Sequence, residues 1–398
     1  MVTLNGGTFK NSASFTMANA INVTGTTAMY AGAANFDPSG SVTGNGTMNT
    51  GGSLGAAASL QFANTVDLSG FTGTITHDNV TNLNNTAFLG TLNTTAKFST
   101  TGATTSSRYL QFAGGTIGEL SGTGGVVRLM GTLNVNQSTN TTYAGVINNG
   151  ALQKSGNGTL TLSNTNTYLG ATAVNAGTLI ISGAISNSSA LTVAAGAQLR
   201  YNSATARTGG LTLSGNGSAS RAVLGGTGSI NAAITLDNLG DTLSPGNSPG
   251  QQAYGVNQTW NSFTYLWEVN NFTGTTAGTD FDQINVTGNM TLTGGLGAYQ
   301  LDITSLTGLN ANGDVGNFSE VDRSWAILTT TSGIDGFNAA NWTLLTTNFT
   351  GSPAYSGTFS LAQMGNDLVL SYAVPEPTTW GLLALSLTTV VVFRRRRR

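Results

Sequence analysis

Acidic side chains in the second half of the chain are the residues whose type and spacing could do chemistry. Asp280 and Asp282 flank Phe281 and therefore share one face of any strand that runs through them. Two carboxylates on one face can serve glycoside hydrolysis or bind calcium. The simpler interpretation, which we favour, is an acidic pair beside a turn in a structural repeat.

A second acidic cluster and the single histidine give weaker signals. Asp314, Glu320 and Asp322 lie in a segment rich in glycine and asparagine, which predicts a loop. His77 adjoins Asp78, but no matching nucleophile can be named, and we expect a solvated loop histidine. One histidine and no cysteine exclude disulfides, cysteine-ligated zinc and His-rich metal sites. We expect no metal and no cofactor, since the Gly-x-Gly elements lack the following helix that cradles a phosphate.

The composition predicts that short strands and tight turns position these residues. Only 8% of residues are charged, 39% are apolar, and there are 55 glycines but 6 prolines. A disordered chain is instead rich in Lys, Glu and Pro. Leu160 and Leu162 alternate with threonines, as in a half-buried strand, and glycine or asparagine follows such segments within a few residues.

Internal repetition predicts that the strands stack as a β-solenoid. The sequence Leu-Gln-Phe-Ala occurs at 60–63 and 110–113, and each copy precedes a Leu-Ser-Gly-x-x-Gly segment, at 68–73 and 120–125. Ser-Gly-Asn-Gly and Gly-Thr-Leu also recur, the second at 131–133, 158–160 and 177–179. Units of this kind bury an apolar face only when they stack on their neighbours.

One stretch resembles the autotransporter-associated β-strand repeat. The matching residues form three short patterns, which are Lys154, Gly156, Gly158, Leu160 and Leu162, then Tyr168, Gly170 and Thr172, then Asn175, Gly177 and Leu179. The resemblance implies a passenger domain folded as a right-handed parallel β-helix and says little about activity. Weaker echoes extend over residues 1–240. We expect no C-terminal outer-membrane barrel, so the export route of true autotransporters is not implied.

The sequence changes character near residue 243. Two Pro-Gly pairs, at 245–246 and 249–250, predict a boundary or a forced turn. Aromatic residues are denser beyond it, and longer strands are predicted at 265–269, 284–287, 299–303, 325–328 and 367–372. We therefore divide the body into a β-helix repeat region, residues 1–242, and a C-terminal β region, residues 243–373, folded as a β cap or small sandwich. The alternative is that residues 243–373 add further β-helix rungs.

Residues 374–398 predict a short transmembrane helix. The segment 378–393 carries no charge, Trp380 lies near its start, and the run that follows it is Arg394, Arg395, Arg396, Arg397 and Arg398. It falls just short of the roughly 17–25 residues that span a bilayer core, and the arginines place its far end in the cytoplasm. The alternative, a buried strand or helix that closes the fold, is disfavoured by five successive arginines.

The order of elements in this tail is similar to the PEP-CTERM sorting signal. Val374, Pro375, Glu376 and Pro377 precede the apolar run and the arginine cluster. The resemblance implies recognition by a membrane exosortase that cleaves near Pro375, Glu376 and Pro377, with the arginines as a temporary membrane stop signal. Such proteins occur in Gram-negative bacteria that make exopolysaccharide or biofilm matrix.

The two ends of the chain carry different information on targeting and charge. Residues 1–7 have neither a basic start nor an apolar core. Either the secretion signal lies upstream of them, which we favour because of the sorting tail, or the protein is not exported. Without the five arginines and Glu376, the body has 9 of the 14 basic and 15 of the 16 acidic residues, a net charge of −6. This balance disfavours nucleic-acid binding, which needs a basic face.

Two functional hypotheses follow from the sequence. The first is an exported, noncatalytic surface or extracellular-matrix protein, adhesive or structural, associated with exopolysaccharide or biofilm. It would be anchored in the inner membrane by the C-terminal helix before processing, then found at the cell surface or outside the cell. The alternative is a carbohydrate-active β-helix enzyme, a polysaccharide lyase or hydrolase, which would place several carboxylates and an Arg or Lys in one groove.

Overall fold

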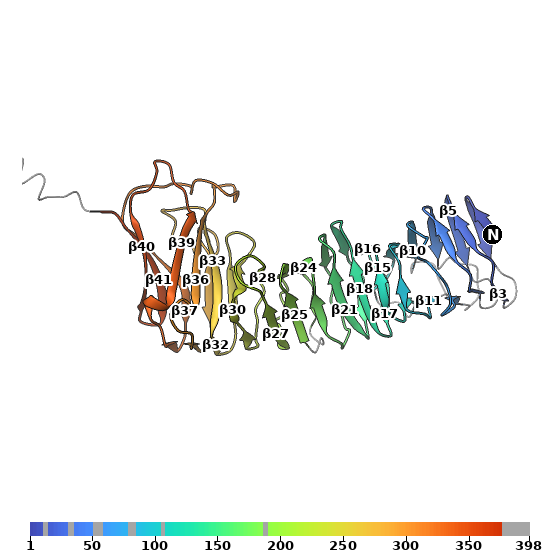
Figure 1. Cartoon of the computed structure of the whole chain (residues 1–398), viewed down its shortest axis with the longest axis horizontal. Helices are drawn as coiled ribbons and strands as arrows, with labels where there is room; N and C mark the ends of the chain where they lie inside the picture. The colour runs from blue at the N-terminus through green and yellow to red at the C-terminus, as the bar shows by residue number, and fades with distance from the viewer. Residues whose placement is uncertain are drawn as a thin grey trace, which may run out of the picture.

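A computed structural model describes residues 1–10, 15–30, 36–50, 59–78, 85–104, 108–185 and 190–375. In these residues the chain is all-β apart from one short 3-10 helix, η1 (Ala339–Asn341). The strands form an elongated rod, in which the chain coils from the N-terminal end to a wider C-terminal end (Figure 1). Strands of successive coils pair in parallel, so the predicted all-β solenoid is confirmed.

One face of the rod is a sheet that runs through the described part of the chain. Its fifteen strands follow sequence order. They are β2 (Gly7–Lys10), β5 (Thr26–Tyr30), β8 (Thr47–Thr50), β10 (Thr74–Asp78), β13 (Lys97–Thr101), β16 (Glu119–Gly122), β19 (Thr141–Tyr143), β22 (Thr159–Leu162), β24 (Gly177–Ile181), β26 (Ala197–Tyr201), β28 (Ala222–Gly226), β30 (Asp237–Pro245), β33 (Ser262–Val269), β36 (Tyr299–Ser305) and β39 (Trp342–Asn348).

A second face is built from two sheets. The first contains β3 (Phe15–Met17), β6 (Phe36–Pro38), β9 (Leu60–Phe62), β11 (Thr86–Phe88), β14 (Leu110–Phe112), β17 (Val126–Leu129) and β20 (Val146–Asn148). The second contains β31 (Gln251–Tyr254), β34 (Gln283–Val286), β37 (Arg323–Thr330), β41 (Asp367–Ala373) and β40 (Thr358–Met364). Isolated parallel bridges such as Asn148 to Thr167 and Ile230 to Tyr254 lie between them.

The third face consists of three shorter sheets. These are β1 (Val2–Leu4), β4 (Ile21–Val23) and β7 (Val42–Gly44), then β12 (Leu92–Asn93), β15 (Gly115–Ile117), β18 (Thr132–Asn136), β21 (Ala151–Ser155), β23 (Thr172–Val174), β25 (Ala190–Ala194), β27 (Gly210–Ser214) and β29 (Ile234–Thr235), and finally β32 (Gln258–Trp260), β35 (Asn289–Leu292) and β38 (Gly333–Asp335). Stacking the three faces pairs the inner strand edges of each coil with those of the next.

A column of leucines shows why the alternating sequence produces stacked coils. Leu160, Leu179, Leu199, Leu224 and Leu243 are register partners from one coil to the next and are fully buried. Each buried leucine contributes about 1.5–3 kcal/mol relative to an exposed one. Because the side-chain period of a strand is two, a slip of one residue would turn the whole column toward solvent.

Phenylalanines form an equivalent column on the second face. The rings of Phe62 and Phe88 stack at 4.5 Å between centroids, and those of Phe88 and Phe112 at 5.8 Å. Phe98, from the long sheet, meets Phe88 and Phe112 edge-on at 5.4 and 5.0 Å. The repeated Leu-Gln-Phe-Ala segments therefore supply equivalent core positions two coils apart.

Beyond residue 243 the coils are wider and richer in aromatic residues. Four of the five longer strands predicted there are confirmed, since β33 and β37 each have eight residues and β36 and β41 each have seven, whereas the strand predicted at 284–287 is β34, which has only four residues. The long sheet crosses the predicted boundary within β30, and parallel pairing continues to β39, whereas β37, β41 and β40 pair antiparallel. These strands combine features of both predicted alternatives, and the division at residue 243 stays a prediction.

The predicted transmembrane helix, residues 378–393, lies outside the described residues. Within residues 1–375, apart from the gaps given above, no helix has the length and apolar character needed to cross a bilayer.

Candidate functional site

The folded body ends at the root of the C-terminal tail. Strand β41 ends at Ala373, and the next residue, Val374, packs half-buried against the hydrophobic core. The Val374 backbone N–H donates to Asp322 Oδ1 at 2.8 Å. Pro375 is exposed and is the last described residue. Of the predicted sorting residues, Glu376, Pro377 and Arg394, Arg395, Arg396, Arg397 and Arg398 lie outside the described part.

Acidic residues hold this root in place. Both carboxylate oxygens of Glu320 lie 3.0 Å from the Tyr372 hydroxyl, which donates to them. Ser356 adds its backbone N–H at 2.7 Å and its hydroxyl at 3.1 Å. Burial raises the pKa of Tyr372, so its hydroxyl stays protonated and able to donate at neutral pH. Glu320 and Asp322 therefore have structural partners, while Asp314 is exposed.

Sequence reasoning missed Tyr372 and Ser356 as partners of Glu320. They lie 52 and 36 residues away along the chain. No local pattern marks such a pair, because the antiparallel return of β40 and β41 brings them together.

The two carboxylates singled out in the sequence face different surroundings. Asp280 is half-buried and accepts hydrogen bonds from Asn271 Nδ2 at 3.0 Å and from the Thr276 N–H at 2.8 Å. Asp282 is fully buried and accepts from the N–H groups of Gly250 at 2.7 Å and Glu268 at 3.0 Å. The spacing that allowed a shared carboxylate site does not produce one.

Asp282 is instead a close neighbour of Glu268. Burial raises the pKa of Asp282 well above its usual range, and the Glu268 carboxylate raises it further. Burial also raises the pKa of Glu268, which the charge of Arg200 partly offsets. With 0% and 8% of their surfaces exposed, the two carboxylates lie inside the solenoid rather than in a groove on its surface. Among the described residues, no group of three or more His, Asp or Glu could hold a metal ion.

His77 is not a solvated loop residue, so that prediction is wrong. It lies on β10, is fully buried, and pairs in register with Thr50 and Thr100. Its Nδ1 lies 3.0 Å from Thr86 Oγ1 and 3.5 Å from Thr50 Oγ1. Threonine hydroxyls of neighbouring strands thus make an interior position acceptable for the ring.

The repeat-like stretch forms a coil built around a buried lysine. Lys154, on β21, is fully buried, and its ammonium donates to the backbone oxygens of Ser155 at 2.7 Å, Gly156 at 2.8 Å and Ala176 at 3.3 Å. Gly156 has a φ of 72°, and a Cβ there would lie 2.4 Å from Gln137 O. The lysine and glycine of the repeat pattern therefore close one corner of the solenoid. Burial of the ammonium group lowers the pKa of Lys154 to about 8.

Comparisons with known families match the two segments whose sequences carry patterns. Residues 152–181, which include Lys154 and its corner, match the passenger-associated-transport-repeat. Residues 373–398 match the PEP-CTERM protein-sorting motif, starting at the last residue of β41. No curated protein matches the chain. The chain thus carries an autotransporter-type repeat within its solenoid and a PEP-CTERM sorting motif directly after its folded body.

Proposed function

We propose that this chain is an exported, noncatalytic surface or extracellular-matrix protein with an adhesive or structural role. The observation that carries the proposal is the position of the sorting motif. Its match starts at Ala373, where the last strand ends, and Pro375 is exposed just beyond. A membrane protease can read a motif in this position without unfolding the solenoid.

The tail supplies the steps of sorting. Pro375, Glu376 and Pro377 form the element that an exosortase recognises, and prolines keep such an element extended and poor in N–H donors. Residues 378–393 hold the precursor in the inner membrane, with the five arginines as the stop signal on the cytoplasmic side. After cleavage the solenoid is free to reach the cell surface or the matrix.

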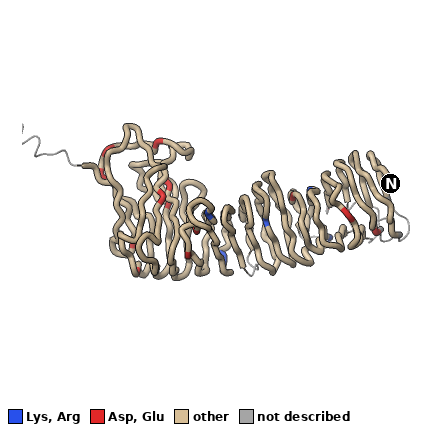
Figure 2. The backbone as a smooth tube through the Cα atoms, viewed as in Figure 1, with Lys and Arg blue, Asp and Glu red and all other residues tan. Residues whose placement is uncertain are grey.

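The surface of the rod suits contact with a polar matrix. Charged residues are sparse along its whole length (Figure 2). Outward positions of the strands carry threonine and asparagine, as in Thr159 and Thr161 of β22 and Asn134 of β18. A long surface of hydroxyl and amide groups can make many weak hydrogen bonds to exopolysaccharide. The alternative of a polysaccharide lyase or hydrolase gains no support from Asp280 and Asp282.

Mass spectrometry of the C-terminus tests the proposal. The full chain, preceded by a secretion signal, is expressed in a Gram-negative host with and without an exosortase. We expect cleavage near residues 375–377 and transfer to the surface only when the exosortase is present. Replacing Pro375, Glu376 and Pro377 by alanine should leave the precursor in the membrane, whereas Leu309→Ala, at a position 93% exposed in the body, should be processed normally. Recovery of an intact Arg398 from surface-exposed protein would contradict the proposal.

A further inference from the structure

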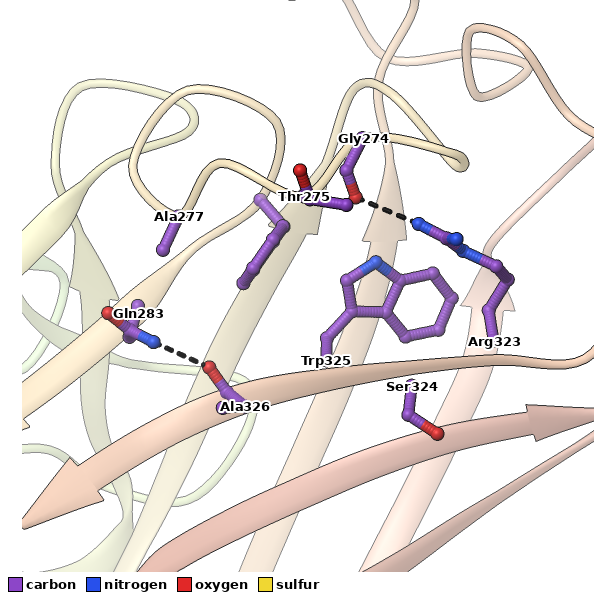
Figure 3. Close-up of a pocket in the computed structure, with 9 residues that line it drawn as sticks. Gly274, Thr275, Ala277, Gln283, Arg323, Ser324, Trp325 and Ala326 are labelled. Atoms are coloured by element: carbon purple, nitrogen blue, oxygen red, sulfur yellow. Dashed lines mark hydrogen bonds between the residues drawn. The ribbon is translucent and has the colours of Figure 1, made fainter.

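A pocket lies beside β37, between this strand and the loop of residues 274–281 (Figure 3). Its volume is about 290 Å³. The pocket exists because β34 pairs with β37 only at Leu328, Thr329 and Thr330. The earlier half of β37 has no such strand neighbour on that side, and Gln283 instead donates its Nε2 to Ala326 O at 2.8 Å.

Trp325 brings an unused donor to this pocket. The residue is 2% exposed, and its indole Nε1 has no hydrogen-bond partner among the residues that the structure describes. In Figure 3 the indole nitrogen points toward the side of the pocket where Gly274 and the Arg323 guanidinium lie. Trp267 and Phe272 fix the ring, each at 5.4 Å between centroids. A buried N–H without an acceptor is costly, so an acceptor placed in the pocket would relieve that cost.

Arg323 adds a positive charge that has neutral partners. Its Nε donates to Phe272 O at 3.2 Å and its Nη2 to Gly274 O at 3.0 Å. These two bonds orient the planar group and leave three of its five N–H groups. The ion pairs among the described residues do not include Arg323. Asp280, the acid of the adjacent loop, is engaged by Asn271 and Thr276.

We propose that this pocket binds the carboxylate of an acidic sugar, one uronate residue of a polysaccharide. The carboxylate accepts from the Arg323 guanidinium and from Trp325 Nε1, which together give charge-assisted recognition. This assignment rests on the proposed function, because a surface protein of the matrix meets such polymers.

The shape and lining of the pocket favour a sugar over an extended acidic peptide. Its volume of about 290 Å³ lies just below the roughly 300–1,000 Å³ typical of small-molecule sites, which is enough for one sugar ring. Phe281 and Ala277 provide an apolar wall for the C–H face of a pyranose, while Thr275 provides a hydroxyl group at the polar edge. Since the body carries a net negative charge, long-range attraction is weak and the affinity for one residue should lie in the millimolar range.

Isothermal titration of the purified full chain measures the binding. The probes are galacturonate and trigalacturonate, with galactose as the neutral match and triglutamate as the acidic peptide. We expect galacturonate to bind at least tenfold more tightly than galactose and the peptide, and binding to weaken as ionic strength rises. Equal affinities for galacturonate and galactose, or no detectable uronate binding, would overturn the proposal. Tighter binding of triglutamate would overturn the sugar assignment.

Variants locate the binding in the pocket. Arg323→Gln should weaken uronate binding at least tenfold, Arg323→Lys should restore part of it, and Trp325→Phe should weaken it by severalfold through loss of the N–H alone. Arg128→Gln, on β17 of the repeat region, is the matched control and should bind as the wild type does. Circular dichroism confirms that each variant is folded. Unchanged affinity in a folded Arg323→Gln variant would place the binding elsewhere and refute the assignment.

This experiment can fail independently of the proposed function. Binding by the purified chain does not depend on sorting, and C-terminal processing does not depend on the pocket. Uronate binding without cleavage would refute only the export proposal, and cleavage without uronate binding would refute only the pocket.

Discussion

Replacement of Lys154 by methionine tests whether the buried ammonium of the repeat corner titrates near pH 8. Methionine keeps most of the apolar stem and removes the charge together with the three hydrogen bonds to Ser155 O, Gly156 O and Ala176 O. A buried carbonyl that loses its donor costs about 1–3 kcal/mol, although Ser155 O still accepts from the Gln137 N–H at 3.2 Å. Near neutral pH this loss is offset, because the variant no longer buries a charge.

The loss of the hydrogen bonds and the removal of the buried charge depend differently on pH. Burial lowers the pKa of Lys154 from an ordinary value of 10.5 to about 8. Between these values the unfolded chain still holds the proton that the folded chain has released, so the free energy of unfolding rises with pH. A tenfold change in a protonation equilibrium is worth about 1.4 kcal/mol. The stability of the wild type relative to Lys154→Met should therefore grow by about 2 kcal/mol between pH 7.5 and 9.5.

Urea unfolding followed by far-ultraviolet circular dichroism measures this difference at several pH values. The buried tyrosines, including Tyr143 and Tyr168, are common to both proteins, so their titration cancels in the comparison. Lys97→Met is the control, because the Lys97 side chain is 48% exposed and pairs with Glu119 at 3.7 Å. An exposed pair of this kind is worth about 0–1 kcal/mol, so this variant shows what removing a lysine charge does where the side chain is not buried. A flat difference for Lys154→Met would refute the reasoning and mean that the three carbonyl oxygens keep the ammonium charged.

Two further predictions concern the core. Phe88→Ala, which removes the ring between Phe62 and Phe112, should lower the free energy of unfolding by about 3–5 kcal/mol, measured by urea unfolding, whereas Phe88→Leu, which still fills most of the space, should cost clearly less. Equal losses would show that the filled volume of the core does not set the cost. The raised pKa values of Glu268 and Asp282 mean that the folded wild type retains protons that the unfolded chain releases, so the wild type loses stability as pH rises from 4 to 7. The variant Glu268→Gln should lose less, so its stability relative to the wild type should be greater at pH 7 than at pH 4. Parallel pH profiles of melting temperature for the two proteins would contradict it.

Local patterns predict the coils but not their long-range register. Leu160 and Leu162 are fully buried as period two requires, and Thr159 and Thr161, which alternate with them, are half-buried. The offset between paired strands varies from coil to coil, since Val2 pairs with Ile21, Thr47 with Thr74, and Gln300 with Thr343. A fixed repeat length is therefore absent from the sequence, and the short segments that recur within it reveal the stacking.

Polar residues in the core show most clearly where sequence reasoning fails. His77 has a polar side chain and an acidic neighbour, which predicts a loop when the sequence is considered alone. Its actual partners, Thr50 and Thr86, come from the neighbouring coil and from the next face, and they become visible only once the register is known. Asp282 and Glu268 meet for the same reason. In a solenoid, each coil supplies the hydrogen-bond partners of the next, so the chemistry of a buried polar residue depends on a distant segment rather than on its neighbours in sequence.

The same principle explains why the tail and the repeat can be predicted from the sequence, whereas the pocket cannot. A sorting motif acts as a contiguous segment, and the corner at Lys154 is formed by its sequence neighbours Ser155 and Gly156 together with Ala176 of the next coil, all within the matched repeat. The pocket instead depends on β37 extending beyond β34, which leaves Arg323 and Trp325 facing the loop that contains Gly274. That geometry arises from the lengths of two strands far apart in the chain. The sorting motif and the repeat are thus encoded in continuous stretches of the sequence. The proposed pocket depends instead on how coils of unequal length are stacked.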